Sequence, residues 1–196
     1  MAVGVGVPTW FVSTAGLHEG QEPFLEWIVL QSNTPDSPWV HSVSYGDIEN
    51  EITIDYATRL DVEFMKFGVS GRSIFVASGN DGSRCADHCR EFVPEWPTSS
   101  PYVTSVGSTT FRTSGAEVGD ERSGGGFSNY YGMPAYQKTA VTGYLSSRLC
   151  PPKTFFNVSG RAYPDVSALS YNFASIFKDI TYPVSDQAAS APVVAG

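Results

Sequence analysis

Two strand patterns separated by one helix pattern constrain the fold of this chain more than any other feature. Residues 39–44 and 73–77 are short runs rich in apolar and β-branched side chains, which is typical of strands. Between them, apolar residues recur with i, i+4 spacing over residues 48–67, and Gly68 and Gly71 follow where a helix would end. This alternation predicts an α/β fold, with a parallel sheet, right-handed crossovers and helices on both faces of the sheet.

The rest of the chain extends this pattern within one domain. A helix is expected to begin at Glu22-Pro23, and a small-residue helix is expected from Ala188 onward. Surface helix and loop are expected over residues 134–152, and a polar loop over residues 115–126. The composition, 41% hydrophobic and 16% charged residues, is that of a globular protein. Further strands are predicted over residues 9–13, 103–106 and 165–169.

Charge and hydropathy exclude several classes of function. The formal net charge of −8 argues against a nucleic-acid surface and suits a soluble protein, including one that works in an acidic compartment. No apolar run approaches the length of a membrane span, so no membrane partner is expected. The first seven residues lack the basic start and the cleavage site of a signal peptide.

Three cysteines permit at most one disulfide within the chain. A zinc site at Cys85 and Cys89 would need two more ligands, and His88 alone is near in sequence, so no metal site is predicted. The triplet Asn157-Val158-Ser159 is a sequon and makes Asn157 the predicted glycosylation site.

Ligands of open parallel sheets bind beyond the carboxyl ends of the strands, which makes the loops at Tyr45-Gly46 and Gly79-Asn80 the candidate site. The side-chain amide of Asn80 follows a buried strand and could donate a hydrogen bond to an oxyanion. The alternative is that Asn80 begins a plain Asn-Asp-Gly turn.

Other polar residues give weaker indications of a site. The glycine-rich stretch that begins at Ser123 is as typical of a simple turn as of a ligand loop. No motif places His18, His41 or His88 beside a serine. Glu51 and Asp55 have the spacing of a paired-carboxylate site, but a solvent-exposed acidic face is the favoured interpretation, and the same holds for Asp81 and Asp87.

Several stretches carry a resemblance to a known family. The chain resembles the sedolisins, serine-carboxyl peptidases with a subtilisin-like fold, and is most similar to their lysosomal exopeptidase branch, which removes tripeptides from free N-termini. The matching stretches follow the order of the family and span nearly the whole chain: Gly20-Gln-Glu-Pro-Phe-Leu-Glu-Trp27, Val43-Ser-Tyr-Gly-Asp47, Ala77-Ser-Gly79, Ser99-Ser-Pro-Tyr-Val-Thr-Ser-Val-Gly107, Ser123-Gly-Gly-Gly-Phe-Ser-Asn129 and Ser159-Gly-Arg-Ala-Tyr-Pro-Asp-Val166.

The resemblance implies a site that has lost part of its chemistry. The nucleophile motif Ser-Gly-Thr-Ser of the family matches residues 185–188, four residues before Pro192, so Ala188 stands where the family has its serine. The oxyanion aspartate of the family matches Asn80. Because a methyl group cannot attack a carbonyl, the chain is expected to be inactive.

The resemblance also implies which parts of the family's domain the chain holds. The Glu-X-X-X-Asp helix, which supplies the family's base, would precede Met1, and Glu51-X-X-X-Asp55 matches a different helix. The calcium ligands, and the cysteine expected to pair with Cys85, would lie beyond Gly196. Residues 1–196 are therefore interpreted as a partial peptidase domain with a subtilisin-like sheet truncated at both ends and no cofactor of its own.

The resemblance further predicts the partners and the compartment. Peptides with free N-termini are the expected partners, in the lysosome or the secretory pathway. The predicted substrate-binding residues lie in two loops: Ser44, Tyr45, Gly46, Ser123, Gly124, Gly125 and Gly126. The alternatives are a pseudo-protease that binds peptides or a peptidase partner, and a splice form or incomplete gene product.

Overall fold

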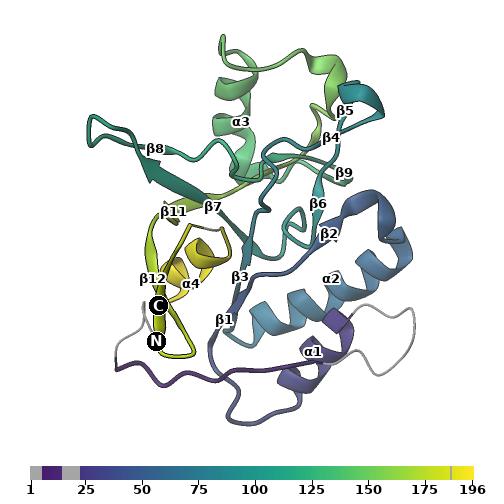
Figure 1. The fold of residues 1–196 in the computed structure, drawn as a ribbon. Helices are drawn as coiled ribbons and strands as arrows, with labels where there is room; N and C mark the ends of the chain where they lie inside the picture. The colour runs from purple at the N-terminus through teal and green to yellow at the C-terminus, as the bar shows by residue number, and fades with distance from the viewer. Residues whose placement is uncertain (1–5, 15–22, 186) are drawn as a thin grey trace.

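Four parallel strands form the centre of the fold (Figure 1). The computed structural model describes residues 6–14, 23–185 and 187–196. The strands lie in the order β1 (Val40–Val43), β3 (Ser73–Ala77), β7 (Thr104–Phe111) and β11 (Val166–Leu169), and β8 (Glu117–Gly119) pairs antiparallel with β7. The predicted α/β fold with a parallel sheet is confirmed.

The strand register brings the carboxyl ends of neighbouring strands together. Val43 of β1 pairs with Val76 of β3, and Ala77 of β3 pairs with Val106 of β7. The residues after β1 and β3 therefore leave the sheet side by side, which is where ligands of such sheets bind.

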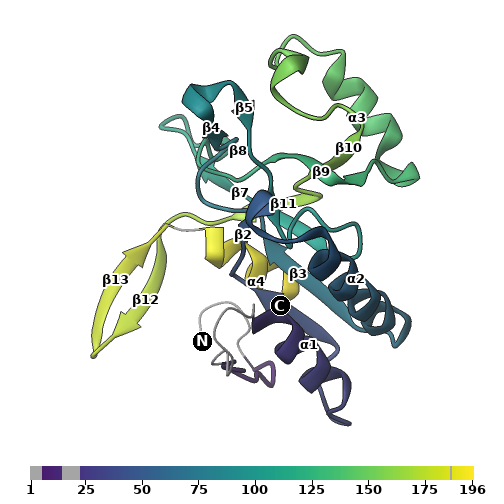
Figure 2. The same ribbon diagram turned by 90° about the vertical axis from the view of Figure 1, so that its right-hand side faces the viewer.

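Helices cover both faces of the sheet. On one face, α1 (Pro23–Ser32) and α2 (Ile54–Val69) pack over Ile74 and Val76 of β3. On the other face, α4 (Ser190–Ala195) packs against all four parallel strands, so that α2 and α4 lie on opposite sides of β3 (Figures 1 and 2). The apolar stripe of α2 supplies much of the core: Ala57, Leu60, Phe64 and Phe67 are all buried.

Short elements and loops form the remaining part of the molecule around α3 (Lys138–Leu145) (Figure 1). They contain the antiparallel pairs β2 (Asp47–Ile48) with β6 (Glu95–Trp96), β4 (Cys85–Ala86) with β5 (Glu91–Phe92), and β9 (Gly126–Gly132) with β10 (Gly160–Tyr163). The 3-10 turns are η1 (Glu49–Glu51), η2 (Asp87–Cys89), η3 (Ala135–Gln137), η4 (Lys153–Phe155) and η5 (Gln187–Ala189).

A fully buried carboxylate joins three of these segments. Glu49 is 0% exposed, and its carboxylate accepts hydrogen bonds from Ser99 Oγ (2.8 Å), Ser128 Oγ (2.5 Å) and the Asn129 amide (2.7 Å). Burial of a carboxylate is costly unless donors replace its water shell, and here three donors do so. Glu49 therefore holds η1, the 97–100 turn and β9 together.

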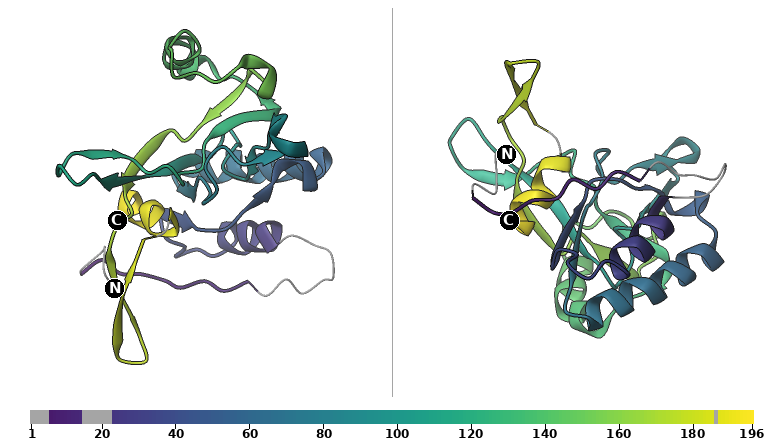
Figure 3. Two further views of the ribbon diagram at one scale, coloured as in Figure 1. Left: turned by 45° about the horizontal axis from the view of Figure 1, so that its top comes forward. Right: turned by 90° about the horizontal axis from the view of Figure 1, so that it is seen from below.

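A hairpin projects from the body of the protein just before α4 (Figures 2 and 3). It consists of β12 (Phe173–Phe177) and β13 (Ile180–Val184), which pair with each other and with no further strand in the described part of the chain. Its large side chains face solvent: Ile176 is 73% exposed and Phe177 is 63% exposed. Neither this hairpin nor the strands β8, β9 and β10 were predicted from the sequence.

Two predicted elements are wrong in position or type. Residues 9–13 form no strand, because no strand in the described part of the chain pairs with them. Phe11 in this segment is 95% exposed. The helix predicted from residue 48 begins at Ile54, since Asp47–Ile48 pair with β6 and η1 follows. The N-cap of that helix is Thr53, whose Oγ1 accepts from the Tyr56 amide at 3.3 Å.

The cysteines pair differently from the family expectation. Cys85 forms a disulfide with Cys89, whereas the resemblance implied a partner beyond Gly196. Cys150 is a free thiol. Among the described residues, no group of three or more His, Cys, Asp and Glu side chains could hold a metal ion. Within the same residues, no helix combines the length and apolarity needed to cross a membrane.

Candidate functional site

The candidate site lies at the carboxyl ends of β1 and β3, next to the residues that precede α4. Ser44 follows β1 directly, and its hydroxyl donates a 2.8 Å hydrogen bond to the carbonyl oxygen of Ala188. These residues are 144 positions apart in sequence. The structure thus brings the predicted substrate loop and the predicted nucleophile position into direct contact.

The turn that carries Asn80 is held by the neighbouring strand and by the glycine loop. The Ser78 amide donates to the Val106 carbonyl at 2.9 Å, and the Gly124 amide donates to the Gly79 carbonyl at 2.9 Å. Gly79 has φ +107°, a conformation that favours glycine. The side chain of Asn80 is exposed at the end of this turn, where it can meet a ligand.

The loop from Ser123 to Gly126 is part of the wall of the site. A Cβ on Gly124 would lie 1.9 Å from the Ser78 carbonyl oxygen, so the two turns can approach this closely only with glycine here. The amides of Ser123, Gly124 and Gly125 donate to carbonyl groups of the protein itself, and Gly126 pairs with Tyr163 in β10. These three amides are therefore engaged within the chain, and peptide binding by this loop stays a prediction.

Tyr45 and Gly46 complete the other wall. The Tyr45 ring is exposed and its centroid lies 5.7 Å from that of Phe24. A Cβ on Gly46 would lie 2.6 Å from the Trp96 carbonyl oxygen, which makes this a second close backbone approach. Their role in substrate binding also stays a prediction.

The other predicted polar residues lie elsewhere. His41 is buried, its Nε2 lies 2.8 Å from the Pro38 carbonyl oxygen, and burial lowers its pKa. His88 is exposed in the β4–β5 connection. Glu51 and Asp55 belong to different elements, η1 and α2, and both are exposed, as the favoured interpretation expected. His18 and the side chain of Asp87 lie outside the described residues.

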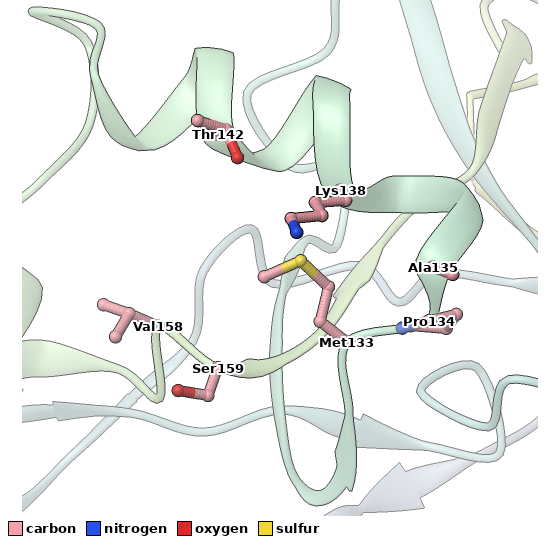
Figure 4. A pocket seen from close by; sticks show the side chains of 7 residues that line it. All are labelled: Met133, Pro134, Ala135, Lys138, Thr142, Val158 and Ser159. Carbon is pink, nitrogen blue, oxygen red and sulfur yellow. The ribbon is translucent and has the colours of Figure 1, made fainter.

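Sequence reasoning missed the carboxylate nearest to the Asn80 turn. Glu95 of β6 lies against Gly79, and burial raises its pKa while the nearby Arg84 guanidinium opposes that shift. No sequence pattern indicates this contact, because Glu95 is 16 positions from Gly79 and belongs to no motif. A hollow of about 370 Å³ beside α3 shares no lining residue with the site (Figure 4).

Comparison with known proteins identifies relatives over the whole chain. It is 47% identical to tripeptidyl-peptidase 1 of Dictyostelium discoideum over 196 residues, which is all of this chain and 33% of the relative. It is 45% identical to tripeptidyl-peptidase 1 of Homo sapiens over 203 aligned positions, which cover 36% of that protein. The chain therefore spans about a third of the length of these curated relatives. No protein-family model matches the sequence.

Solved structures agree on the fold. A Pseudomonas sedolisin, described as a serine-carboxyl proteinase, superimposes with a TM-score of 0.62 at 20% identity over 89% of this chain and 49% of that one. The prenylagaramide maturation protease PagA superimposes with a TM-score of 0.52 at 18% identity over 88% of this chain and 47% of that one. The fold is thus similar to sedolisin and subtilisin-like folds. Over its whole length the chain is similar to tripeptidyl-peptidase 1, and its fold is similar to that of a sedolisin.

Proposed function

We propose that this chain carries a tripeptidyl-peptidase-type peptide site that binds peptides with free N-termini without hydrolysing them. The observation that carries the proposal is the hydrogen bond from Ser44 Oγ to the Ala188 carbonyl. It aligns the position of the family's nucleophile with the end of β1, and that position is occupied by a methyl group.

The chemistry of the site separates binding from hydrolysis. Acyl transfer to an enzyme needs a hydroxyl, thiol or comparable group at the attacking position, and Ala188 offers none. Asn80 can still donate to a peptide carbonyl oxygen at any pH, because its amide needs no prior protonation. The site therefore keeps a means of polarising a carbonyl group and lacks the group that would attack it.

Main-chain pairing is the proposed mode of binding. β1 is the end strand of the sheet among the described residues, and an edge strand can hold an extended peptide by its own N–H and C=O groups. Ser44 follows that strand directly and contacts Ala188, and Tyr45 and Gly46 come next along the chain. A peptide laid along them would present a carbonyl group to the Asn80 turn.

The resemblance also supports a lysosomal or secretory location and a glycan on Asn157. Nδ2 of the Asn157 side chain donates to the Ser128 carbonyl oxygen at 2.9 Å, and Oδ1 of the same side chain accepts from the Ser159 backbone amide at 3.1 Å. A glycosylated asparagine keeps one N–H, so the glycan is compatible with that donor bond. Glycosidase treatment of the secreted wild-type protein should change its electrophoretic mobility. The same treatment of Asn157→Gln should leave its mobility unchanged, which would support the assignment.

Hydrolysis and binding are tested separately. The purified chain should release no tripeptide from an unblocked peptide at acidic pH, and release above the no-protein background would contradict the proposed inactivity. Calorimetry should detect binding of the same unblocked peptide and weaker binding of its N-acetylated form. Absence of heat with both peptides would contradict the peptide site.

Replacing Ala188 with serine tests whether the missing hydroxyl is the only defect. We expect Ala188→Ser to remain without turnover, because the family's base is the carboxylate of a Glu-X-X-X-Asp helix, and the same spacing at Glu51 and Asp55 falls on two different, exposed elements. Turnover by this variant would show that the site still holds a competent base. In that case Ala188 alone would account for the inactivity.

A further inference from the structure

The two-residue strand β6 contacts the three segments that border the candidate site. They are the Tyr45–Gly46 loop, the glycine loop of residues 123–126 and the Gly79–Asn80 turn. Trp96 pairs with Asp47 of β2, and its carbonyl oxygen packs against Gly46. The Glu95 amide donates to the Tyr163 hydroxyl at 2.9 Å, and the same hydroxyl lies 3.2 Å from the place where a Cβ on Gly126 would be. β6 thus connects the Tyr45–Gly46 loop with the glycine loop.

The side chain of Glu95 reaches the third segment, the Gly79–Asn80 turn. Its carboxylate carbon and both of its oxygens would lie 2.2–2.6 Å from a Cβ on Gly79, so the carboxylate occupies the space beside the Gly79 backbone. The Glu95 side chain is 14% exposed. A largely buried carboxylate therefore forms the packing surface of the turn that ends in Asn80.

The charges around Glu95 balance it incompletely. Arg84 Nη1 lies 3.9 Å from Glu95 Oε1, but the same nitrogen also lies 3.5 Å from Asp81 Oδ2. Asp47 of β2 adds further negative charge, and Tyr163 of β10 adds a neutral hydroxyl. Burial raises the pKa of Glu95, Arg84 lowers it, and Asp81 and Asp47 raise it further. The carboxylate therefore takes up its proton more readily than an exposed glutamate would.

We propose that Glu95 is a positioning residue whose protonation state sets the Gly79–Asn80 turn and, through that turn, the affinity of the site for peptides. The inference about affinity rests on the proposed function. An ionised carboxylate beside the turn makes the electrostatic potential there more negative, which opposes the approach of a peptide carbonyl oxygen to Asn80. Protonation of Glu95 removes that opposition. Peptides should therefore bind more tightly in acid.

The turn itself gives the first test. In a nitrogen-15 NMR titration of the whole chain, the amide signals of Gly79 and Asn80 should shift with a midpoint above the ordinary glutamate value of about 4.3. Glu95→Gln keeps the size of the side chain and removes its charge, so the chemical shifts of these amides should no longer change with pH. The matched control Glu91→Gln alters an exposed carboxylate in the adjacent β5 and should preserve the titration. Persistence of the titration in Glu95→Gln would overturn the proposal.

A double-mutant cycle gives the second test. Gly79→Ala introduces a methyl group into the space of the Glu95 carboxylate and should lower the melting temperature. In the Glu95→Ala background that overlap is absent, so the same change should lower it less, although the positive φ of Gly79 still disfavours alanine. Strictly additive effects would contradict the packing role of Glu95.

Peptide binding gives the third test and separates the two proposals. The wild-type chain should bind an unblocked peptide about three- to tenfold more tightly at pH 4 than at pH 7, a change of one order of magnitude at most in Kd. Glu95→Gln should bind with one affinity across that range. If no peptide binds, the proposed function fails while the titration and the cycle still decide the role of Glu95. A pH dependence that survives in Glu95→Gln would overturn the link between Glu95 and affinity.

Discussion

The two turns that meet at the candidate site are held in different ways. The turn that ends in Asn80 is held by main-chain hydrogen bonds from Ser78 to Val106 and from Gly124 to Gly79, and by the Glu95 carboxylate. The turn that contains Ala188 follows an exposed hairpin and contacts the opposite wall through Ser44 Oγ. The first turn is packed between neighbouring loops, whereas the second leads into α4, which packs against the four parallel strands.

This difference bears on the proposal that the site has lost its reacting group and kept its shape. The contacts that fix the Asn80 turn involve backbone groups and Glu95, and none of them uses the side chain of residue 188. The Ser44 bond to residue 188 uses the carbonyl oxygen, which every residue has. Alanine at residue 188, the predicted nucleophile position, therefore leaves the contacts recorded around both turns available.

Among changes to residues near the candidate site, the largest effect is expected from the buried carboxylate that joins η1, the 97–100 turn and β9. Glu49→Ala removes the acceptor of three donors, which are the buried Ser99 and Ser128 hydroxyls and the backbone amide of Asn129. We expect a loss of about 3 kcal/mol in the free energy of unfolding, measured by urea denaturation. The exposed Glu51→Ala serves as control and should stay within about 0.5 kcal/mol of wild type. Equal losses of unfolding free energy from the two changes would show that Glu49 does not hold η1, the 97–100 turn and β9 together.

A smaller effect is expected from overpacking the contact between the two glycine-containing turns. Gly124→Ala places a methyl group 1.9 Å from the Ser78 carbonyl oxygen, and both partners are backbone groups that cannot rotate away. We expect a loss of about 2 kcal/mol in unfolding free energy, together with weaker peptide binding. Gly119→Ala, where no atom lies within 4 Å, should change neither. An unaltered Gly124→Ala protein would mean that the Asn80 turn is not tightly packed.

The pH dependence of stability tests the buried carboxylate that α2 contributes. Asp61 accepts from Ser100 Oγ at 2.7 Å, and burial raises its pKa. Because the folded pKa is the higher one, the stabilisation from protonated Asp61 is complete below the unfolded value of about 3.9 and is lost as pH rises through the folded value. Asp61→Asn should flatten this fall in unfolding free energy, measured by denaturation from pH 3 to pH 7. The exposed Asp55→Asn on the same helix provides the comparison, and identical slopes in wild type and Asp61→Asn would contradict the assignment.

The smallest effect is expected from the hairpin that leads to the Ala188 turn. Phe177→Ser and Ile176→Thr alter side chains that face solvent, so each should change the unfolding free energy by less than about 0.5 kcal/mol. Phe67→Ala, in the core, should cost about 3–5 kcal/mol by the same thermal or urea measurement. A hairpin variant that costs more than about 1 kcal/mol would show that the second turn is held as firmly as the first.

Much of the fold was predictable because it depends on local pattern. The strand over residues 73–77 has the predicted bounds, and the helix that precedes it keeps its buried stripe of Leu60, Phe64 and Phe67. The helix start was wrong by several residues because Asp47–Ile48 pair with β6, a partner about 47 positions away that no periodicity can indicate. The predicted strand at 9–13 failed for the related reason that a strand pattern becomes a strand only beside a partner.

The candidate site divides in the same way. Asn80 and Ala188 were identified from motif order, since each belongs to a short stretch whose sequence is itself distinctive. The functional roles of Ser44, Tyr45, Gly46 and the glycine loop remain predictions. Glu95 and Glu49 were missed, because a carboxylate in a polar loop looks the same in sequence whether it faces water or is buried against a distant turn.

The amino-acid sequence alone was enough to predict the alternation of strands and helices, the resemblance to the sedolisins and the match of Ala188 to the family's nucleophile position. These predictions depend on residue identity and on spacing along the chain. The three-dimensional structure was needed to show that Ser44 contacts Ala188, that there is no space for a side chain at Gly124 and that Glu95 packs against Gly79. The physical reason is that hydrogen bonds, steric overlap and burial act over a few ångströms in space, and the chain brings residues up to 144 positions apart within that range.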